Sequence, residues 1–353
     1  MRSTRVLVVR ADEPEPEIIA IAAEAIREGK LVAFPTETVY GLGADAFNPE
    51  AVVEIFRAKG RPAHDPLIVH VASGAELQRV ARHIPDVACQ LAERFWPGPL
   101  TLVLPKAESV PSVVTAGGDT VAVRCPSHPV ALALLRAAAT PIAAPSANRF
   151  GHTSPTTAEH VLDDLQGRID LILDGGPTWV GVESTVLDLT GEVPAILRPG
   201  GTTREALESV LGPVQIVERV KSTSAAPLPS PGMMERHYAP HTPLWLFVGP
   251  AALVREALLK QARELTSLGK RVGLLIAEDD GPAFAGELVV REEVGSAADL
   301  ETVAKNLYPA LRRLDALGLD VILARDFGVQ GLGLAIRDRL IRAADRVIPI
   351  AHE

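Results

Sequence analysis

Hydrophobic residues in the first two-thirds of the chain fall into short apolar runs, separated by segments with the spacing of amphipathic helices. Residues 17–27 place apolar side chains on one helix face, and residues 31–35 form a continuous apolar run that predicts a buried strand. Further strand-like runs lie at residues 67–71, 101–104, 120–124, 141–145, 170–174, 184–189 and 195–198. This order predicts an α/β fold in which helices flank a twisted sheet. The last three of these runs, at 170–174, 184–189 and 195–198, follow one another directly, which favours a mixed sheet over a purely parallel one.

Polar residues mark the starts of two predicted helices. Asn48 precedes Pro49, an order that suits a helix N-terminus because the Asn side chain accepts from free backbone amides. Thr156 has Glu159 three residues later, which is the spacing of a capping box.

The pattern changes after residue 212 and predicts a second domain. Residues 222–232 (STSAAPLPSPG) lack core-forming side chains and are typical of a linker. Strand-like runs then recur at 245–248, 271–277, 287–290 and 320–324, with helices near 251–267 and 297–317, the latter capped by Ser296. We expect a catalytic domain over residues 1–212, a linker over 213–241, and a smaller Rossmann-like α/β accessory domain over 242–353.

Composition limits the classes of function. Hydrophobic residues make up 47% of the 353 positions and aromatic residues 4%, so the core must consist mainly of aliphatic side chains. A formal net charge of −9 argues against a protein that coats nucleic acid, but it leaves room for local basic pockets. Two cysteines provide neither a disulfide framework nor a zinc site, and no apolar run reaches about 18 residues. We therefore expect a cytoplasmic protein.

Two local motifs invite a functional interpretation that we do not favour. The segment from Gly41 to Ala46 matches the dinucleotide-binding pattern G-x-G-x-x-A, but the helix signal at Asn48 comes after it. We expect these glycines to allow a tight turn or a close approach to a ligand. Cys125 lies between Arg124 and His128, which would lower the pKa of a reactive thiol. A small buried residue at a strand end is the interpretation we favour.

Hydroxyl and basic side chains recur at or near the ends of the predicted strands. They occur in the segments 36–38, 59–62, 65–70, 120–124, 145–148, 154, 184 and 198. Ligands of open α/β sheets bind at strand ends, and guanidinium groups match carboxylates and phosphates. The residues therefore predict a polar pocket for a phosphorylated ligand and a small zwitterion.

Several of these segments resemble a known family. The motifs FPTETVYGLG, KGRP, PLIVHV, WPGPLTLVL, GGDTVAVR, PIAAPSAN, GVESTVLDL and LRPGG resemble the YrdC-type domain of threonylcarbamoyl-AMP synthases. PGMMERHYAP is similar to the linker of their two-domain members, and GLGLAIRDRL to the end of their C-terminal domain. The resemblance spans nearly the whole chain, with the motifs in the expected order.

The resemblance implies a nucleotidyltransferase that converts L-threonine, bicarbonate or CO2, and ATP into threonylcarbamoyl-AMP and pyrophosphate. A tRNA threonylcarbamoyl transferase complex would then move the product's threonylcarbamoyl group to an adenosine next to the anticodon. The implied threonine contacts are Thr38, His70, Arg124, Ala144 and Ser184. The implied ATP contacts are Arg61, Asp65, Thr120, Ser146, Ser154, Arg198 and Tyr238. Lys59 and Arg61 would stabilise phosphate charge, and Mg²⁺ would accompany ATP with Asn148 nearby, without an organic cofactor.

One position departs from the family pattern. Many members carry Asn where this chain has Asp65, and an ionised Asp side chain cannot donate a hydrogen bond. An ATP contact at this position would then run through the backbone or through magnesium.

Tyr238 lies in the predicted linker, and we expect this segment to close over the nucleotide as a lid. A hydrophobic anchor for the linker is the plainer interpretation of the same residue. Two other functions stay open: a module that binds double-stranded RNA weakly, and carbamoyl transfer in hydrogenase maturation. Proteins of the latter kind carry zinc-finger cysteines, whereas this chain has two cysteines in all.

Overall fold

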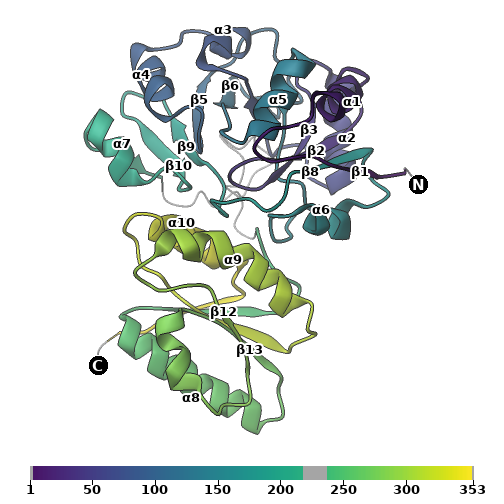
Figure 1. The fold of residues 1–353 in the computed structure, drawn as a ribbon. Coiled ribbons are helices and arrows are strands. Elements are labelled where there is room, and N and C mark those ends of the chain that lie inside the picture. The colour runs from purple at the N-terminus through teal and green to yellow at the C-terminus, as the bar shows by residue number, and fades with distance from the viewer. Residues whose placement is uncertain (1–2, 218–236, 352–353) are drawn as a thin grey trace. The chain divides into compact units, whose positions relative to one another are not determined.

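A computed structural model describes residues 3–217 and 237–351 of the chain. The chain folds into two compact units (Figure 1). The first comprises residues 1–150 and 154–235, and the second comprises residues 151–153 and 236–353. Much of the predicted linker, residues 218–236, lies outside the described residues, so its boundaries at 213 and 241 stay a prediction.

The described strands of the first unit form one mixed sheet, as the sequence predicts. Its order is β1-β8-β2-β3-β7-β4-β6-β5-β9-β10-β11, with parallel and antiparallel neighbours. The strands are β1 (Arg5–Val8), β2 (Val32–Pro35), β3 (Tyr40–Asp45), β4 (Ile68–His70), β5 (Leu100–Pro105), β6 (Thr120–Arg124), β7 (Ile142–Ala143), β8 (Leu171–Asp174), β9 (Thr185–Asp188), β10 (Ala195–Arg198) and β11 (Gln215–Ile216).

Helices cover this sheet and close two aliphatic cores. The helices are α1 (Pro16–Arg27), α2 (Pro49–Lys59), η1 (Gly74–Glu76), α3 (Leu77–Val80), α4 (Asp86–Phe95), α5 (Pro129–Ala138), α6 (Ala158–Leu165) and α7 (Arg204–Leu211). Helices α1 and α5 pack together over β2 and β8, whereas α2, α3 and α4 contribute to a larger core. Both cores consist mainly of Val, Ile, Leu and Ala, as the low aromatic content requires.

The central strands present their two faces to different surroundings. Val69 of β4, Val123 of β6 and Leu102 of β5 belong to the large core. Because side chains alternate along a strand, the neighbouring positions His70 and Arg124 point to the opposite face. That face carries a small apolar cluster, which comprises Ile68, Val103, Ala122, Val186 and Leu197. It is therefore the face on which polar groups can gather.

The glycines of the G-x-G-x-x-A pattern serve the sheet rather than a dinucleotide. Gly41 and Gly43 lie within β3, an antiparallel neighbour of both β2 and β7. A Cβ atom on Gly43 would lie 2.7 Å from Ile142 and 2.8 Å from Phe34. The expected tight turn is wrong, because both glycines lie within a strand and Gly43 allows close packing of side chains on neighbouring strands; the expected close approach to a ligand stays a prediction.

The helix caps agree with the sequence to within a few residues. Asn48 accepts hydrogen bonds from the backbone amides of Glu50 and Ala51, as predicted. The helix near residue 156 is capped by Thr157 rather than Thr156.

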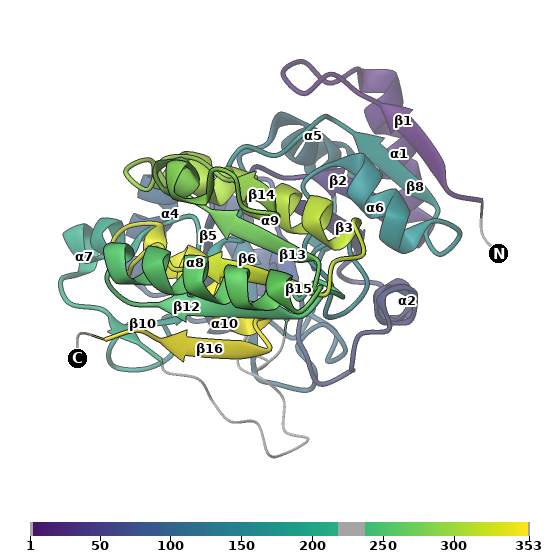
Figure 2. The same cartoon turned by 90° about the horizontal axis from the view of Figure 1, so that it is seen from below.

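The second unit is a parallel sheet with helices on both faces, the Rossmann-like arrangement that the sequence predicts. Its strands are β12 (Leu244–Val248), β13 (Val272–Ile276), β14 (Val290–Glu293), β15 (Val321–Arg325) and β16 (Arg346–Pro349), in the order β14-β13-β15-β12-β16. Helix α8 (Ala251–Ser267) and η2 (Glu278–Phe284) lie on one face, and α9 (Leu300–Asp315) and α10 (Gly333–Ala343) on the other (Figures 1 and 2). Asp299, not Ser296, caps α9. Among the described residues, none of the helices has the length and apolar character needed to cross a membrane.

Candidate active site

Most of the predicted site residues are polar and yet buried. Each of the following is at most 7% exposed: Thr38, Lys59, Arg61, Asp65, His70, Arg124, Asn148, Ser154, Ser184 and Arg198. All of them belong to the first unit. Burial of polar and charged groups is costly unless they are paired or bind a ligand, so this concentration makes the region the candidate site.

Three basic side chains surround one carboxylate. Burial raises the pKa of the Asp65 carboxyl, and the charges of Arg61, Lys59 and Arg198 act in the opposite direction. The three basic groups outnumber the carboxylates here even when Asp164, which also acts on Lys59, is counted. Such an excess of buried positive charge favours an anionic ligand such as a phosphate chain.

The end of α2 brings Arg61 into this cluster. Gly60 adopts the left-handed conformation (φ 68°) that ends the helix, and Arg61 is the next residue. Arg61 Nη2 lies 2.8 Å from Asp65 Oδ1, and it donates to the carbonyl oxygen of Pro66 at 2.8 Å. Arg61 Nε donates to the carbonyl oxygen of Asp65 at 3.1 Å. These contacts fix the guanidinium against the loop.

Lys59, the last residue of α2, is held by the segment that follows β7. Its Nζ donates to the carbonyl oxygens of Ser146, at 2.5 Å, and of Asn148. Burial and the neighbouring Arg61 lower the pKa of the Lys59 amine well below its usual range. An ammonium group has three donors, so two backbone contacts leave one for a ligand.

Arg198 reaches the site through an irregularity of the sheet. The pairing of β10 with β9 shifts register between Ile196 and Arg198, and such bulges re-aim side chains. Arg198 Nη2 donates to the Ser184 carbonyl oxygen at 2.9 Å and to Ser184 Oγ at 3.2 Å. Ser184 Oγ also lies 2.8 Å from Thr101 Oγ1. Ser184, directly before β9, is thereby held by a residue of β10 and a residue of β5.

Arg124, at the end of β6, is paired with a carboxylate. Its Nη2 lies 2.8 Å from Glu37 Oε1, and its Nε donates to the carbonyl oxygen of Gly98 at 3.3 Å. The second carboxylate oxygen of Glu37 accepts from the backbone amide of Ser127 at 3.1 Å. Glu37 and Arg124 are both almost fully buried, so the pair holds its geometry without competition from water.

His70 lies beside Arg124 because β4 and β6 pair in register at these two residues. Burial, and next the charge of Arg124, lower the pKa of the imidazole to about 3. His70 Nδ1 has no hydrogen-bond partner among the described residues. A neutral imidazole with an unused nitrogen is suited to bind an uncharged or donating ligand group.

Two further predicted threonine contacts are buried near the neighbouring strands β2, β3 and β7. The Thr38 hydroxyl lies 2.8 Å from that of Thr36, directly before β3. The backbone amide of Ala144 donates to the carbonyl oxygen of Ile68 at 2.9 Å. Its methyl group faces β3, where a Cβ on Gly41 would lie 3.4 Å away.

The remaining predicted ATP contacts are less concentrated. Ser154 Oγ donates to Glu183 Oε1 at 2.6 Å, and Glu183 directly precedes Ser184. Thr120 is the first residue of β6 and Arg124 the last, so about 13 Å of strand separates them. The contacts of one long ligand can span this length, but a single small group cannot touch both residues.

Tyr238 belongs to the second unit and is buried there. Its ring stacks on Tyr308, with ring centroids 6.0 Å apart, and Arg339 lies over the ring at 5.1 Å. Its backbone has a positive φ of 63°, which is uncommon for a residue with a bulky side chain. The carbonyl oxygen of Tyr238 accepts from the Thr153 hydroxyl at 3.3 Å. These contacts are those of an anchored residue within its own unit.

Sequence reasoning missed two acidic members of the set and one hydroxyl. Glu37 pairs with Arg124, Glu183 accepts from Ser154, and Thr101 contacts Ser184. Glu37 and Glu183 each stand beside a residue that we did select, within the segments TET and VEST. The sequence signal for them is the adjacency of acidic and hydroxyl residues, whereas groups that contact anions are basic or carry hydroxyls.

The structure also bears on the possible reactive thiol and on metal binding. Cys125 is buried, and burial raises the pKa of its thiol to about 12, which favours the small buried residue over an activated thiol at this position. Among the described residues, no group of three or more His, Cys, Asp or Glu side chains is placed to hold a metal ion.

Comparison with known proteins assigns the chain to a family. A family model described as "Telomere recombination" matches residues 24–200, and one described as "Threonylcarbamoyl-AMP synthase, C-terminal domain" matches residues 202–345. The threonylcarbamoyl-AMP synthase of Pyrococcus abyssi is 50% identical over 94% of this chain and 96% of its own length. That of Bacillus subtilis is 47% identical over 98% of both chains.

Solved structures agree with this assignment. The crystal structure of P. abyssi Sua5 in complex with L-threonine has a TM-score of 0.92 and 48% sequence identity, and the match covers 98% of this chain and all of that one. The match therefore includes both units, the mixed sheet and the parallel sheet that follows it. The chain therefore belongs to the threonylcarbamoyl-AMP synthase family of nucleotidyltransferases, in its two-domain form.

Proposed function

We propose that this chain joins L-threonine, bicarbonate or CO2, and ATP into L-threonylcarbamoyl-AMP with release of pyrophosphate. The observation that carries the proposal is the pair of neighbouring polar clusters in the first unit. Lys59, Arg61 and Arg198 form a basic group around Asp65, and the sheet that carries Arg198 also carries Arg124 with His70. One cluster suits a phosphate chain and the other an amino acid.

In the proposed threonine subsite, Arg124 binds the substrate carboxylate. The guanidinium retains donors beyond those used by Glu37 and Gly98, since it has five N–H groups in all. His70 Nδ1 accepts from the substrate's hydroxyl or amine, and Ser184 and Thr38 supply hydroxyl contacts. Ala144 contacts the substrate methyl group, so discrimination against serine amounts to about 1–3 kcal/mol.

In the proposed ATP subsite, Arg61, Arg198 and the third donor of Lys59 offset the charge of the phosphates. The backbone of Asp65, or its carboxylate through magnesium, completes the contacts to the nucleotide together with groups of Thr120, Ser146 and Ser154. Mg²⁺ enters with ATP rather than as a resident ion, in keeping with the surplus of basic over acidic groups around Asp65. Asn148 is the residue we assign to its vicinity, and the ion adds further positive charge at the phosphates.

The chemistry then needs little acid–base assistance. The threonine amine combines with CO2 and releases a proton, which gives a carbamate. A carbamate oxygen attacks the α-phosphorus of ATP, the bond to the β-phosphate oxygen breaks, and pyrophosphate leaves with its electron pair. The buried pairs that fix Arg61 and Arg124 hold both reactants in place, and positioning of this kind supplies up to about 7–11 kcal/mol. Basic groups near the phosphates stabilise charge that develops on the leaving group.

The segment 213–241 is proposed as a linker whose Tyr238 end closes the site as a lid. The support is the left-handed backbone at Tyr238, since strained conformations gather at clamps and switches. Its buried ring equally suits an anchor, and the two roles require separate tests. The product is then passed to a tRNA threonylcarbamoyl transferase complex, and any RNA contact of this acidic chain is weak.

Isotope labelling tests the proposed reaction. The protein is incubated with ATP, L-threonine, Mg²⁺ and ¹³C-bicarbonate, and the products are separated and weighed by mass spectrometry. The proposal requires a threonylcarbamoyl-AMP that is one mass unit heavier than the product from unlabelled bicarbonate. An unlabelled threonyl-AMP instead would show that the enzyme activates threonine directly, without a carbamoyl group.

A further inference from the structure

A cavity of about 480 Å³ lies in the first unit, outside the set of predicted site residues. Its walls come from η1, α3, α4, α5 and the segments that follow β4 and β6 (Figure 1). This volume is within the range of small-molecule sites in proteins. Its lining is mainly apolar and includes Leu77, Ala92, Trp96 and Leu132.

Two helix faces meet across this cavity. Cys89, Ala92 and Glu93 have the spacing of one face of α4, and Leu132 and Arg136 that of one face of α5. Each face thus presents apolar side chains followed by one charged residue near the helix C-terminus. The cavity therefore has an apolar interior with an acidic and a basic group at its rim.

Neither rim charge is neutralised within the described part of the chain. Arg136 and Glu93 are both exposed, and no residue in the described ranges forms an ion pair or side-chain hydrogen bond with either. Arg136 acts on the pKa of the Cys125 thiol, another lining residue, so its charge lies near the cavity. A cation and an anion at the mouth of an apolar cavity match a zwitterion with an apolar side chain.

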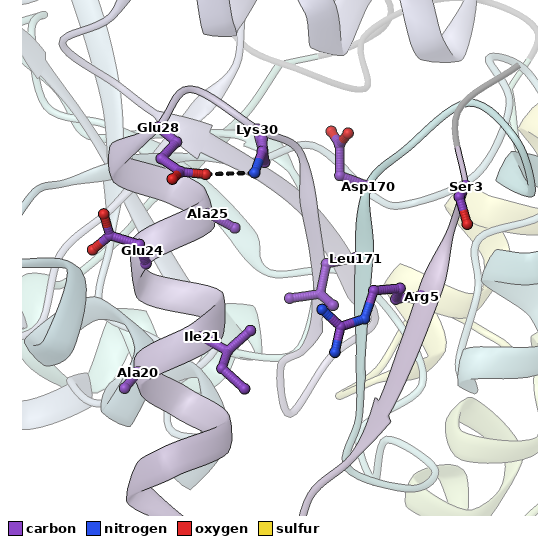
Figure 3. Close-up of a pocket in the computed structure, with 10 residues that line it drawn as sticks. All are labelled: Ser3, Arg5, Ala20, Ile21, Glu24, Ala25, Glu28, Lys30, Asp170 and Leu171. Carbon is purple, nitrogen blue, oxygen red and sulfur yellow. Dashed lines mark hydrogen bonds and ion pairs between the residues drawn. The ribbon is translucent and has the colours of Figure 1, made fainter.

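Another hollow of this unit lacks this property. It has about 550 Å³ and lies beside α1 and the edge strand β1 (Figure 3). There Lys30 and Glu28 are paired at 2.5 Å (Figure 3), and Glu24 is paired with Arg27 at 2.5 Å. The charges of that hollow are largely satisfied by neighbouring residues, so it presents less charge to a ligand.

We propose that the cavity between α4 and α5 binds a free amino acid with an apolar side chain, with Arg136 at the carboxylate, Glu93 at the ammonium group and the side chain against Trp96. Its floor lies on the opposite side of the chain from the proposed threonine subsite, because Cys125 belongs to the large core and directly follows Arg124. The two are tied further at Gly98, which donates its amide to the Cys125 carbonyl oxygen at 2.8 Å and accepts from Arg124 Nε at 3.3 Å.

Alkylation of Cys89 gives a readout at this cavity that does not depend on catalysis. The chain has two cysteines, and only Cys89 is exposed, so iodoacetamide should modify Cys89 alone. L-Phenylalanine should slow this modification in a saturable way at concentrations below about 10 mM. 3-Phenylpropionate and phenethylamine, which each lack one charge, should need higher concentrations, and L-threonine should give no protection.

Four variants complete the test. Arg136→Ala and Glu93→Gln should each raise the concentration for half protection about three- to fivefold, as expected for one exposed ion pair. Ala75→Trp places a bulky side chain at an exposed lining position and should abolish protection. Arg94→Ala, a neighbouring exposed arginine that does not line the cavity, should behave like the unchanged protein. Absence of protection, or equal protection by 3-phenylpropionate or in Arg136→Ala, would overturn the proposal.

Discussion

The carboxylate of Glu37 lies 2.8 Å from the guanidinium of Arg124, and both side chains are buried. The two residues are far apart in the sequence: Glu37 lies between β2 and β3, and Arg124 is the last residue of β6. Glu37 fixes the guanidinium and also neutralises part of its charge. It is therefore a positioning residue of the proposed threonine subsite, and its removal should affect threonine binding through Arg124.

Glu37→Gln should make the protein depend on threonine for stability. The variant leaves the Arg124 cation buried without its partner, at a cost of about 3–5 kcal/mol in the free energy of unfolding. A bound threonine carboxylate would supply the missing negative charge. The rise in melting temperature on addition of threonine should therefore be larger in the variant than in the unchanged protein. An equal rise in both would show that the threonine carboxylate does not pair with Arg124.

Arg124→Ala should abolish threonine-dependent pyrophosphate release while the fold persists. The reason is that the proposed carboxylate partner of the substrate is lost. Because this change alone leaves Glu37 unpaired, the double variant Arg124→Ala/Glu37→Gln serves as the control with no buried unpaired charge. Circular dichroism checks the fold of both. Near-normal turnover in a folded variant would refute the assignment of Arg124.

Asp65→Asn should strengthen ATP binding about three- to tenfold, which corresponds to the removal of one negative charge from a site that binds an anion. Asn has nearly the same shape as Asp, but the change leaves the buried Arg61 without its charged partner, so the free energy of unfolding should fall as it does in Glu37→Gln, and binding is compared at a temperature where both proteins are folded. Isothermal titration with a non-hydrolysable ATP analogue measures the effect. Weaker binding would mean that the carboxylate itself holds the nucleotide or its magnesium ion.

His70 should make the protein less stable in mild acid. Its pKa is about 3 in the folded protein against about 6.5 when unfolded, so the unfolded chain binds the additional proton. Stability from this group is complete above about pH 6.5 and is lost progressively as the pH falls toward 3. Between pH 7 and pH 5 the loss should be about 2 kcal/mol. Urea unfolding at both pH values measures it.

His70→Gln is the matched variant for this prediction, since glutamine is polar and does not titrate. The difference in unfolding free energy between pH 7 and pH 5 should shrink by most of that amount. The buried His128, whose pKa burial lowers to about 4, should retain its own share of the pH dependence. An unchanged pH dependence in His70→Gln would show that this imidazole is not buried in its neutral form.

A pair of variants separates the lid from the anchor at Tyr238. Tyr238→Ala and Tyr308→Ala each remove one member of the same stacked pair in the second unit. If Tyr238 closes over the nucleotide, its variant should raise the KM for ATP severalfold more than Tyr308→Ala does. Loss of stability should be similar in the two. Equal effects on KM would leave Tyr238 with the role of an anchor.

Strands and helices could be predicted from the sequence where apolar runs were continuous. They were harder to predict where the packing between strands determines the conformation. The segment YGLGAD was not expected to be a strand, because its glycines signal turns. The segment is nevertheless a strand, and glycine is needed at position 43 because a Cβ there would be too close to Ile142 and Phe34. The N-caps of α6 and α9 lie at Thr157 and Asp299, one and three residues after the predicted positions, and the local sequence does not define a helix end more finely than this.

For the candidate site, the residue types could be predicted but several partners could not. Arg61 and Asp65 are four residues apart, and their pairing follows from local geometry. Glu37 and Arg124 meet only because a mixed sheet brings distant strands together, which composition and spacing do not encode. Arg198 enters the site through a register shift in β10, and a bulge of this kind has no sequence signal here.

Amino-acid selectivity of pyrophosphate release tests the central claim most directly. The full-length protein is incubated with ATP, Mg²⁺ and bicarbonate, and release is followed with each amino acid in turn and with none. We expect release that requires both bicarbonate and an amino acid, and that is faster with L-threonine than with L-serine by about 10- to 100-fold. Release that proceeds without bicarbonate, or equally well with any amino acid, would contradict the account.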